Sequence, residues 1–220
     1  MLGKIFVGVI ALGAVAAPAA AQRQFQVGPR VGYTRFAEKT GIESSAMVGL
    51  DAMYSLFGNL SVGVRFDFAR PVTDGRYSPA EMTFGDTTMV FTVSQPLTIV
   101  HYAAAAEFAI GGRLSPFVNG AVGGYRISLD PQSANAATSV NQLLFAVGGG
   151  IDFQVSGGTS VRLSVTDLIY NKFDRANLNP VDPRFAPVRF PDAVPPQPPF
   201  EGAAHNIHFA LAFSFAPGGR

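Results

Sequence analysis

The stretch NQLLFAVGGGIDF, residues 141–153, alternates between two sets of residues. One set, Leu143 to Phe153 in steps of two, is bulky and apolar except for Gly149. The other set, Gln142 to Gln154 in the same steps, is mostly small or polar. A period of two places the sets on opposite faces of an extended strand. The stretch therefore predicts a strand between unlike environments, with about the length (9–11 residues) that a tilted strand needs to cross a bilayer.

Seven other segments of the chain share this alternation. They cover residues 24–36, 45–57, 60–70, 96–110, 115–129, 159–171 and 203–215. Only the facing of segment 115–129 is ambiguous, because glycine and valine alternate in it. Eight such strands, without an apolar run as long as a membrane helix, predict an all-β fold: a single antiparallel eight-stranded up-and-down transmembrane β-barrel.

The connections between these segments alternate in length. Those after the second, fourth and sixth segments are short and glycine-rich, whereas the others are longer, and residues 71–95 and 172–202 form the longest. Outer-membrane barrels have short periplasmic turns and long outer loops. We therefore expect both ends of the chain to lie in the periplasm, as an even number of strands requires.

The N-terminus has the features of an export signal. Lys4 is followed by the apolar residues 5–15 and by Ala19-Ala20-Ala21, a small-residue cleavage site. We expect residues 1–21 to be a cleaved secretory signal peptide, with an uncleaved anchor as the alternative. Residues 22–216 would then form the outer-membrane β-barrel and residues 217–220 a short C-terminal tail.

Composition agrees with a membrane barrel and argues against nucleic-acid binding. Removal of Lys4 leaves 15 of the 16 basic residues against 15 acidic ones, a formal charge of zero. Hydrophobic residues make up 48% of the chain and charged residues only 14%, where about 25% charged is usual for a soluble domain. The chain has no cysteine, so no disulfide contributes to its stability.

With strands and loops in place, the chain resembles the eight-stranded outer-membrane β-barrel proteins of the OmpA, OmpX and OmpW type. Its most specific feature is the last strand, in which Ile207, Phe209, Leu211, Phe213 and Phe215 share one face. That strand looks like the signal read by the barrel assembly machinery, although residues 216–220 follow the terminal aromatic. The resemblance implies a bacterial outer-membrane location, in contact with outer-membrane lipid and lipopolysaccharide.

Alternation also predicts a polar network inside the barrel. The expected inward-facing members are Arg30, Asp51, Arg65, Asp67, Glu107, Asp152 and Arg162, with Gln142 and Gln154 beside them. An eight-stranded barrel is just wide enough for side chains to fill it. The first interpretation is a structural set of ion pairs, and the alternative is a narrow gated path or a bound small molecule.

The sequence offers no clear enzymatic signature. Alternation places His101 inward near the outer end of its strand, and His205 lies at the outer start of the last strand. No nucleophile elbow and no His-Glu-x-x-His metal motif accompanies them. We therefore expect no catalytic residues, no cofactor and no metal.

The expected function is a non-enzymatic envelope role: structural, surface interaction through the outer loops, or restricted passage of small or hydrophobic solutes. The proline-rich loop 174–202 is expected to be a solvated or lid-like segment, or else to bind a partner or lipopolysaccharide phosphates. Two other functions stay open. A lipid-modifying barrel enzyme would place His101 or His205 against a serine or carboxylate at the rim. A secreted soluble lipocalin-like barrel would turn the phenylalanine-rich faces inward. The residues indicate neither a ligand nor an oligomeric state.

The inside–outside assignment makes testable statements about single residues. Arginine in place of Val64 or Val147 is expected to reduce barrel folding sharply, because arginine at the bilayer midplane costs about 2–4 kcal/mol. Serine at a lumen-facing glycine is expected to be milder. Six aromatic residues near strand ends are candidates for girdles at the membrane interfaces: Tyr33, Phe57, Phe68, Phe117, Tyr170 and Phe215.

Overall fold

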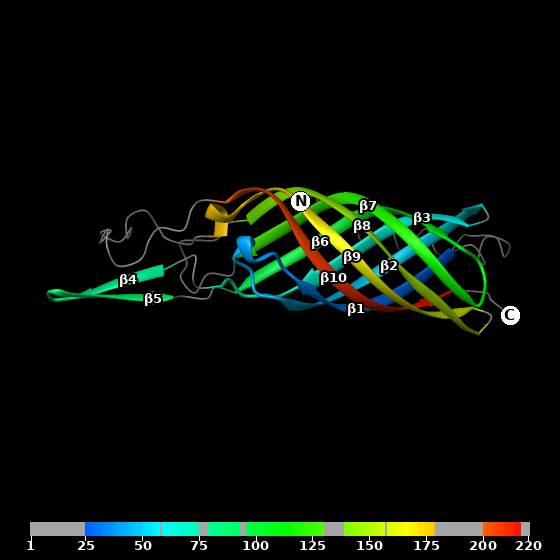
Figure 1. The fold of residues 1–220 in the computed structure, drawn as a ribbon, viewed down its shortest axis with the longest axis horizontal. Helices are drawn as coiled ribbons and strands as arrows, with labels where there is room; N and C mark the ends of the chain where they lie inside the picture. Colours follow the sequence, from blue (N-terminus) through cyan, green and yellow to red (C-terminus); the bar gives the residue numbers. More distant parts are fainter. Residues whose placement is uncertain are drawn as a thin grey trace, which may run out of the picture.

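The computed structural model describes residues 25–57, 59–74, 79–92, 96–129, 139–156, 158–178 and 200–216. The expected signal peptide 1–21, the tail 217–220 and most of the proline-rich loop lie outside these ranges. Within them the chain forms a closed barrel with strand order β1-β10-β9-β8-β7-β6-β3-β2, every neighbouring pair antiparallel (Figure 1). The predicted eight-stranded up-and-down barrel is confirmed.

The strands of the barrel follow the predicted segments closely. They are β1 (Phe25–Arg35), β2 (Ser45–Phe57), β3 (Leu60–Ala69), β6 (Leu97–Ala109), β7 (Leu114–Leu129), β8 (Ser139–Ser156), β9 (Thr159–Asp174) and β10 (Glu201–Phe215). Two short 3-10 helices, η3 (Glu38–Thr40) and η5 (Arg175–Leu178), lie at the outer end. No helix in the described part of the chain is long and apolar enough to cross a membrane.

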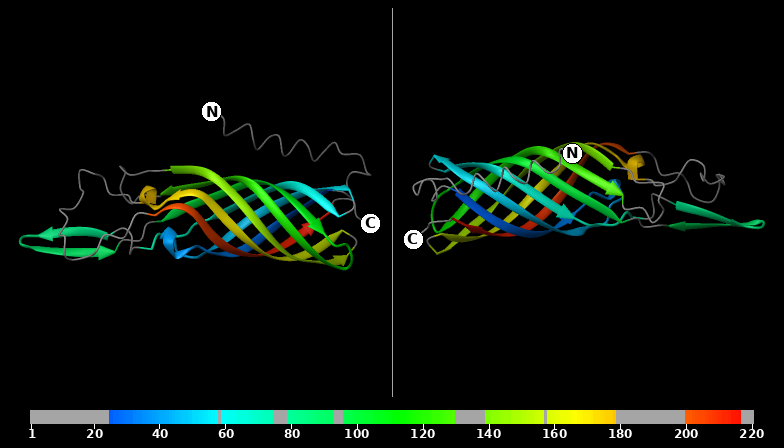
Figure 2. Two further views of the ribbon diagram at one scale, coloured as in Figure 1. Left: turned by 45° about the horizontal axis from the view of Figure 1, so that its top comes forward. Right: turned by 180° about the vertical axis from the view of Figure 1, so that it is seen from behind.

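The long connection between β3 and β6, expected as a loop, contains a further hairpin. Strands β4 (Pro79–Phe84) and β5 (Thr87–Thr92) pair with each other and not with the barrel. Gly85 supplies the positive φ of 58° that the tight turn requires. Figures 1 and 2 show the hairpin projecting beyond the outer end of the barrel. Six-residue strands are too short to cross a bilayer, which is why a search for membrane-length alternation passes over them.

The barrel wall has the predicted polarity. Bulky apolar side chains face outward and stay exposed, including Val147 at 58%, Phe66 at 47% and Phe145 at 42%. The seven charged residues expected inside include Arg30 at 3% exposure and Asp67 at 1%. A lipocalin-like barrel requires the opposite arrangement, so that alternative is wrong.

Strand β7, whose facing was ambiguous, is resolved by its burial pattern. Val118 and Val122 are exposed on the outer wall, and Phe117, Asn119 and Tyr125 are buried inside. The other predicted facings agree with the burial patterns of β1, β2, β3, β6, β9 and β10.

The polarity of the wall reverses toward the outer end. Strands β7, β8 and β9 have 16, 18 and 16 residues, more than the roughly 9–11 that a bilayer needs. In these extensions the inward residues are apolar, as with Ile127 and Leu168, whereas Arg126 and Asn141 face outward. The end that carries the long connections therefore has an apolar interior and a polar exterior, the arrangement of a soluble barrel, as expected for strands that extend beyond a bilayer.

Candidate functional site

The lumen contains three successive regions. The ionic layer comprises the seven predicted charged residues: Arg30, Asp51, Arg65, Asp67, Glu107, Asp152 and Arg162. On its outer side lies an apolar cluster, the outer plug: Phe36, Ile42, Met47, Ala69, Leu97, Ile99, Tyr125, Ile127, Leu129, Leu144, Ala146, Leu168, Tyr170, Phe173, Leu178 and Ala204. On its periplasmic side lies a polar vestibule.

The first group of the ionic layer is centred on Arg30. Its guanidinium donates to both carboxylate oxygens of Asp67, from Nε at 2.6 Å and from Nη2 at 2.9 Å. Its Nη1 reaches Asp51 at 3.5 Å, and Arg65 Nε donates to the same Asp51 oxygen at 3.0 Å. Gly49 leaves room for this group, because a Cβ there would overlap the Asp67 carboxylate. Four strand residues far apart in sequence thus form one buried network.

The second group is centred on Arg162 of β9. It donates to Glu107 Oε2 at 2.8 Å and to Asp152 Oδ2 at 2.9 Å. Its guanidinium carbon also lies 4.5 Å from the ring centroid of Phe117, a cation–π contact. Gln142 and Gln154 make no hydrogen bond to either group within the described residues.

Two histidines lie between the ionic layer and the outer plug. His101 Nε2 is 2.6 Å from the Tyr170 hydroxyl, and His208 Nδ1 is 2.9 Å from Thr34 Oγ1. Tyr170 stacks on Tyr125 with ring centroids 4.1 Å apart. The sequence pattern placed His101 inward but did not indicate this aromatic partner, because the contact joins residues 69 positions apart.

The segments around η3 and η5 pack against the outer plug and are hydrogen-bonded to each other and to β10. Ala37 donates its backbone N–H to Asn206 Oδ1 at 3.0 Å, and Arg175 Nη1 donates to the Lys39 carbonyl at 3.1 Å. Lys39 Nζ in turn donates to the Ala203 carbonyl at 2.8 Å. These bonds connect η3 and its flanking residues to β10 and η5 beside the outer plug.

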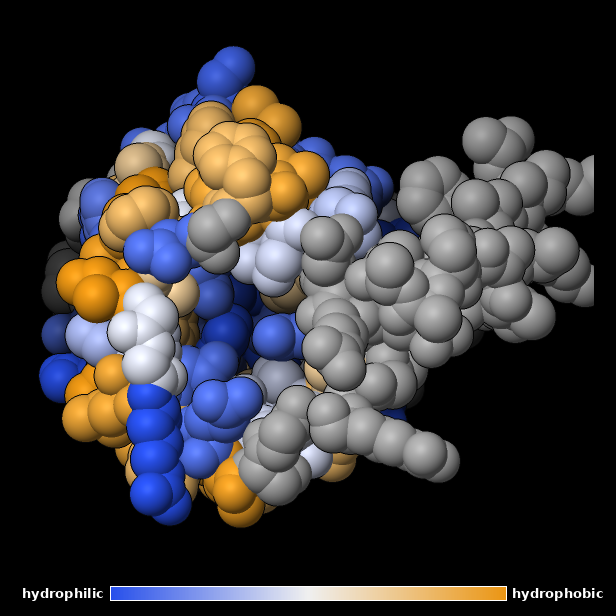
Figure 3. Space-filling model, turned by 90° about the vertical axis from the view of Figure 1, so that its right-hand side faces the viewer, coloured by the Kyte–Doolittle hydropathy of each residue, from blue (hydrophilic) through white to orange (hydrophobic). Residues whose placement is uncertain are grey.

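The periplasmic mouth is hollow and polar. A cavity of about 300 Å³ is lined by hydroxyl and amide side chains from the strand ends and reaches Glu107, Asp152 and Arg162. Figure 3 looks at this end and shows hydrophilic residues in the hollow, with hydrophobic residues around them. This cavity therefore brings solvent up to the Arg162 group of the ionic layer.

Inward-facing glycines of β3 and β8 are tightly packed against neighbouring strands. A Cβ on Gly150 would overlap the Leu163 carbonyl and lie 2.8 Å from Phe117 Cζ. A Cβ on Gly63 would overlap the Ala52 carbonyl. Such positions cannot accept a side chain without movement of the backbone, so serine there is expected to carry a measurable cost; that this cost is smaller than that of arginine on the outer wall stays a prediction.

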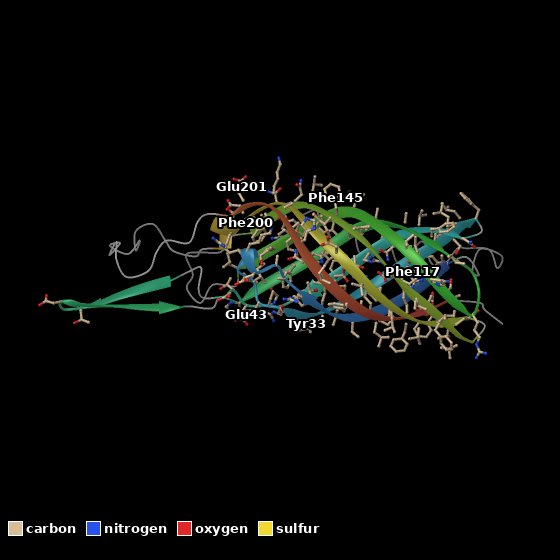
Figure 4. All side chains as sticks on the ribbon, in the orientation of Figure 1. Tyr33, Glu43, Phe117, Phe145, Phe200 and Glu201 are labelled. Atoms are coloured by element: carbon tan, nitrogen blue, oxygen red, sulfur yellow. The ribbon has the colours of Figure 1, made fainter. Side chains whose placement is uncertain are left out.

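Two of the six aromatic residues expected in girdles at the membrane interfaces lie inside the barrel instead. Phe117 is 4% exposed and Tyr170 is fully buried, and both point into the lumen. Tyr33, Phe57 and Phe215 remain exposed at 53%, 70% and 46%. Figure 4 shows Tyr33 and Phe145 on the outside of the wall, with Phe200 and Glu201 near the outer rim.

His205 lies outside the barrel and pairs with a carboxylate. It is exposed near the outer end, and its Nδ1 is 2.7 Å from Asp167 Oδ2. No serine hydroxyl is bonded to His205 in the described part of the chain. A search of the same residues for three or more clustered His, Cys, Asp or Glu side chains finds no candidate metal site.

A closed antiparallel barrel with an apolar outer wall and a layer of charged residues inside it is typical of bacterial outer-membrane proteins. The chain belongs to the family described as outer membrane protein beta-barrel domain, whose model matches residues 7–185. This membership implies a bacterial outer-membrane location.

Solved structures share the fold at low sequence identity. Neisserial surface protein A (NspA) is 10% identical, with a TM-score of 0.58 over 87% of this chain and 96% of that chain. OprG from Pseudomonas aeruginosa is 10% identical, with a TM-score of 0.45 over 88% and 96%. Ail of Yersinia pestis is 12% identical, with a TM-score of 0.42 over 87% and 99%. A sequence comparison with curated proteins gave no match. The likeness to NspA supports the fold alone.

Proposed function

We propose that this protein is a closed, non-enzymatic outer-membrane barrel that presents its outer loops at the cell surface. In this proposal residues 1–21 direct export and are cleaved. The observation that carries the proposal is the filled lumen: the ionic layer and the outer plug occupy it in succession. An eight-stranded barrel leaves little room beyond its side chains, so two filled regions argue against passage of solutes.

The proposal that outer loops are displayed at the cell surface rests on the β4–β5 hairpin, which projects beyond the barrel (Figure 1). Its turn residues Gly85 and Asp86 are exposed. An epitope inserted between Gly85 and Asp86 should be detected by antibody on intact cells. The same epitope at the exposed Gly112 in the opposite turn should be detected only after the outer membrane is permeabilised. Detection of the second epitope on intact cells would contradict the proposed orientation.

Closure can be measured directly. Purified protein reconstituted in planar bilayers should show no stepwise conductance, and liposomes containing it should not swell in small sugars. A Tyr125→Ala/Tyr170→Ala variant, which removes the stacked pair from the plug, tests whether the plug contributes to closure. Stable conductance by the unmodified protein would refute the proposed closed state.

A lipid-modifying enzyme is the second candidate, and the His205–Asp167 contact is the observation that favours it. A carboxylate that orients a histidine is part of many hydrolytic sites, but a nucleophile is also needed. Mass spectrometry of lipid A and phospholipids from an overexpressing strain distinguishes the candidates. Chemical change that disappears in His205→Asn would establish the enzyme and overturn the non-enzymatic proposal.

Assembly is the last part of the proposal. Phe209, Phe213 and Phe215 form an exposed outward row on β10, as expected for a strand read by the barrel assembly machinery. Replacing Phe215 with serine should slow the appearance of folded barrel in cells. Unfolding in purified samples should change much less.

A further inference from the structure

The outer wall contains an apolar groove that the proposed function does not use. The groove has a volume of about 600 Å³ and crosses β1, β10, β9 and β8. Val31, Tyr33, Val165, Phe209 and Leu211 line it. All five project from the lipid-facing side of the barrel, so the groove is continuous with the surface that contacts hydrocarbon.

A glycine explains why the wall is hollowed there. Gly149 faces outward, and a Cβ at this position would lie 2.7 Å from the Phe117 carbonyl oxygen on β7. The close approach of the two strands therefore excludes a side chain. Its neighbours on the same face of β8, Val147 and Ile151, are exposed at 58% and 46% and stand on either side of the gap.

Polar residues follow the groove immediately on its outer side. Two positions beyond Tyr33, Arg35 faces outward and is exposed; two positions beyond Val165 comes Asp167. In the register, Arg35 and Asp167 both pair with Ile207 of β10, on opposite sides of it. His205 lies two positions further outward on the same face of β10. Arg35, Asp167 and His205 thus form a polar cluster at the outer end of the groove.

This cluster can receive an anion. Arg35 makes no ion pair or hydrogen bond within the described residues, so its guanidinium is available. Asp167 Oδ2 contacts Nδ1 of His205, which leaves the imidazole Nε2 unbonded in the described part of the chain. Asp167 repels an anion on its own side, so the anion is expected beside Arg35 and His205. Arginine matches phosphate oxygens with two parallel hydrogen bonds.

We propose that this groove and polar cluster bind an anionic lipid of the outer leaflet whose phosphate groups are not neutralised by an attached ammonium, with an acyl chain in the groove and a phosphate on Arg35. The arrangement has the two parts that such a lipid presents, an apolar chain and an anionic head, in the correct order across the membrane. The site lies on the outside of the wall. It is independent of the role proposed for the closed lumen, since lipid binding would stand if the lumen conducted and closure would stand if no lipid bound.

Native mass spectrometry can test the site. Folded full-length protein in mild detergent is offered equal amounts of bis-phosphorylated lipid A and zwitterionic phosphatidylethanolamine, and bound lipids are counted. Unmodified protein should prefer lipid A. Arg35→Gln should lower that preference about tenfold, as expected for loss of a charge-assisted contact, and Arg35→Lys should retain part of it. Arg126→Gln, at an exposed outward arginine on β7, is the matched control and should change nothing.

A second pair of variants tests the groove itself. Val165→Phe fills it, and Val122→Phe adds the same bulk to an outward position on β7, with exposures of 48% and 52% before substitution. Only Val165→Phe should reduce lipid A binding, and heat-modifiability gels verify that both variants fold. Equal lipid A binding by all variants would overturn the proposal. Equal losses in Arg35→Gln and Arg126→Gln would also overturn it, because they would indicate a nonspecific basic belt.

Discussion

Replacing Asp67 with alanine removes the main partner of a buried arginine. Arg30 and Asp67 have side-chain exposures of 3% and 2%, and two hydrogen bonds of 2.6 and 2.9 Å join them. The remaining carboxylate contact of Arg30, to Asp51, is 3.5 Å long and weak. Breaking a buried ion pair from one side costs about 3–5 kcal/mol, because the other charge stays buried without its partner.

The effect is large enough to measure by urea unfolding. With a urea dependence of about 2 kcal/mol per molar, a loss of about 4 kcal/mol lowers the midpoint by about 2 M. Folded fraction can be followed in lipid vesicles by gel mobility and circular dichroism. Exposed Asp86, replaced by asparagine, is the control and should leave the midpoint unchanged.

The double variant Arg30→Met/Asp67→Leu separates the charge effect from packing. Apolar replacement of both partners is often neutral, so its free energy of unfolding should lie within about 2 kcal/mol of the unmodified protein. The reasoning would be refuted if Asp67→Ala cost less than about 1 kcal/mol. It would also be refuted if Arg30→Met and Asp67→Leu, measured singly, simply added up in the double variant.

Three other predictions use the same urea assay. Val147→Arg should lower the free energy of unfolding by about 2–4 kcal/mol, because the side chain at this position faces hydrocarbon. An unchanged urea midpoint would contradict the outward assignment of Val147. Gly150→Ala should lower the free energy of unfolding by about 1–3 kcal/mol, because the added Cβ would overlap the Leu163 carbonyl. An unchanged urea midpoint would mean that β8 and β9 move apart at little cost. Tyr170→Phe should cost about 1–3 kcal/mol by leaving His101 Nε2 unbonded, and no loss would show that water replaces the hydroxyl.

Local alternation was sufficient to predict the strands and which way their side chains face, wherever the outer and the lumen-side environments stay the same along the strand. Leu60 to Ala69 shows this: each outward residue meets hydrocarbon and each inward one meets the lumen. Nearness to a strand end, without regard to the alternation, was a poor guide to the aromatic residues. Phe117 and Tyr170, expected at the interfaces, point inward because side chains from other strands leave space for them and provide Arg162 and His101 as partners.

The sequence by itself determined the eight strands of the barrel, the apolar outer wall and the residues of the ionic layer, because a period of two is a local property of a strand. The tertiary structure decided which charges pair. Arg30 and Asp67 are 37 residues apart in sequence, and the register of β1, β2 and β3 brings them into contact. It also decided that the outer half of the lumen is an apolar plug, since strand length relative to the bilayer sets where the polarity reverses. The groove at Gly149 likewise exists only because β7 and β8 approach closely there.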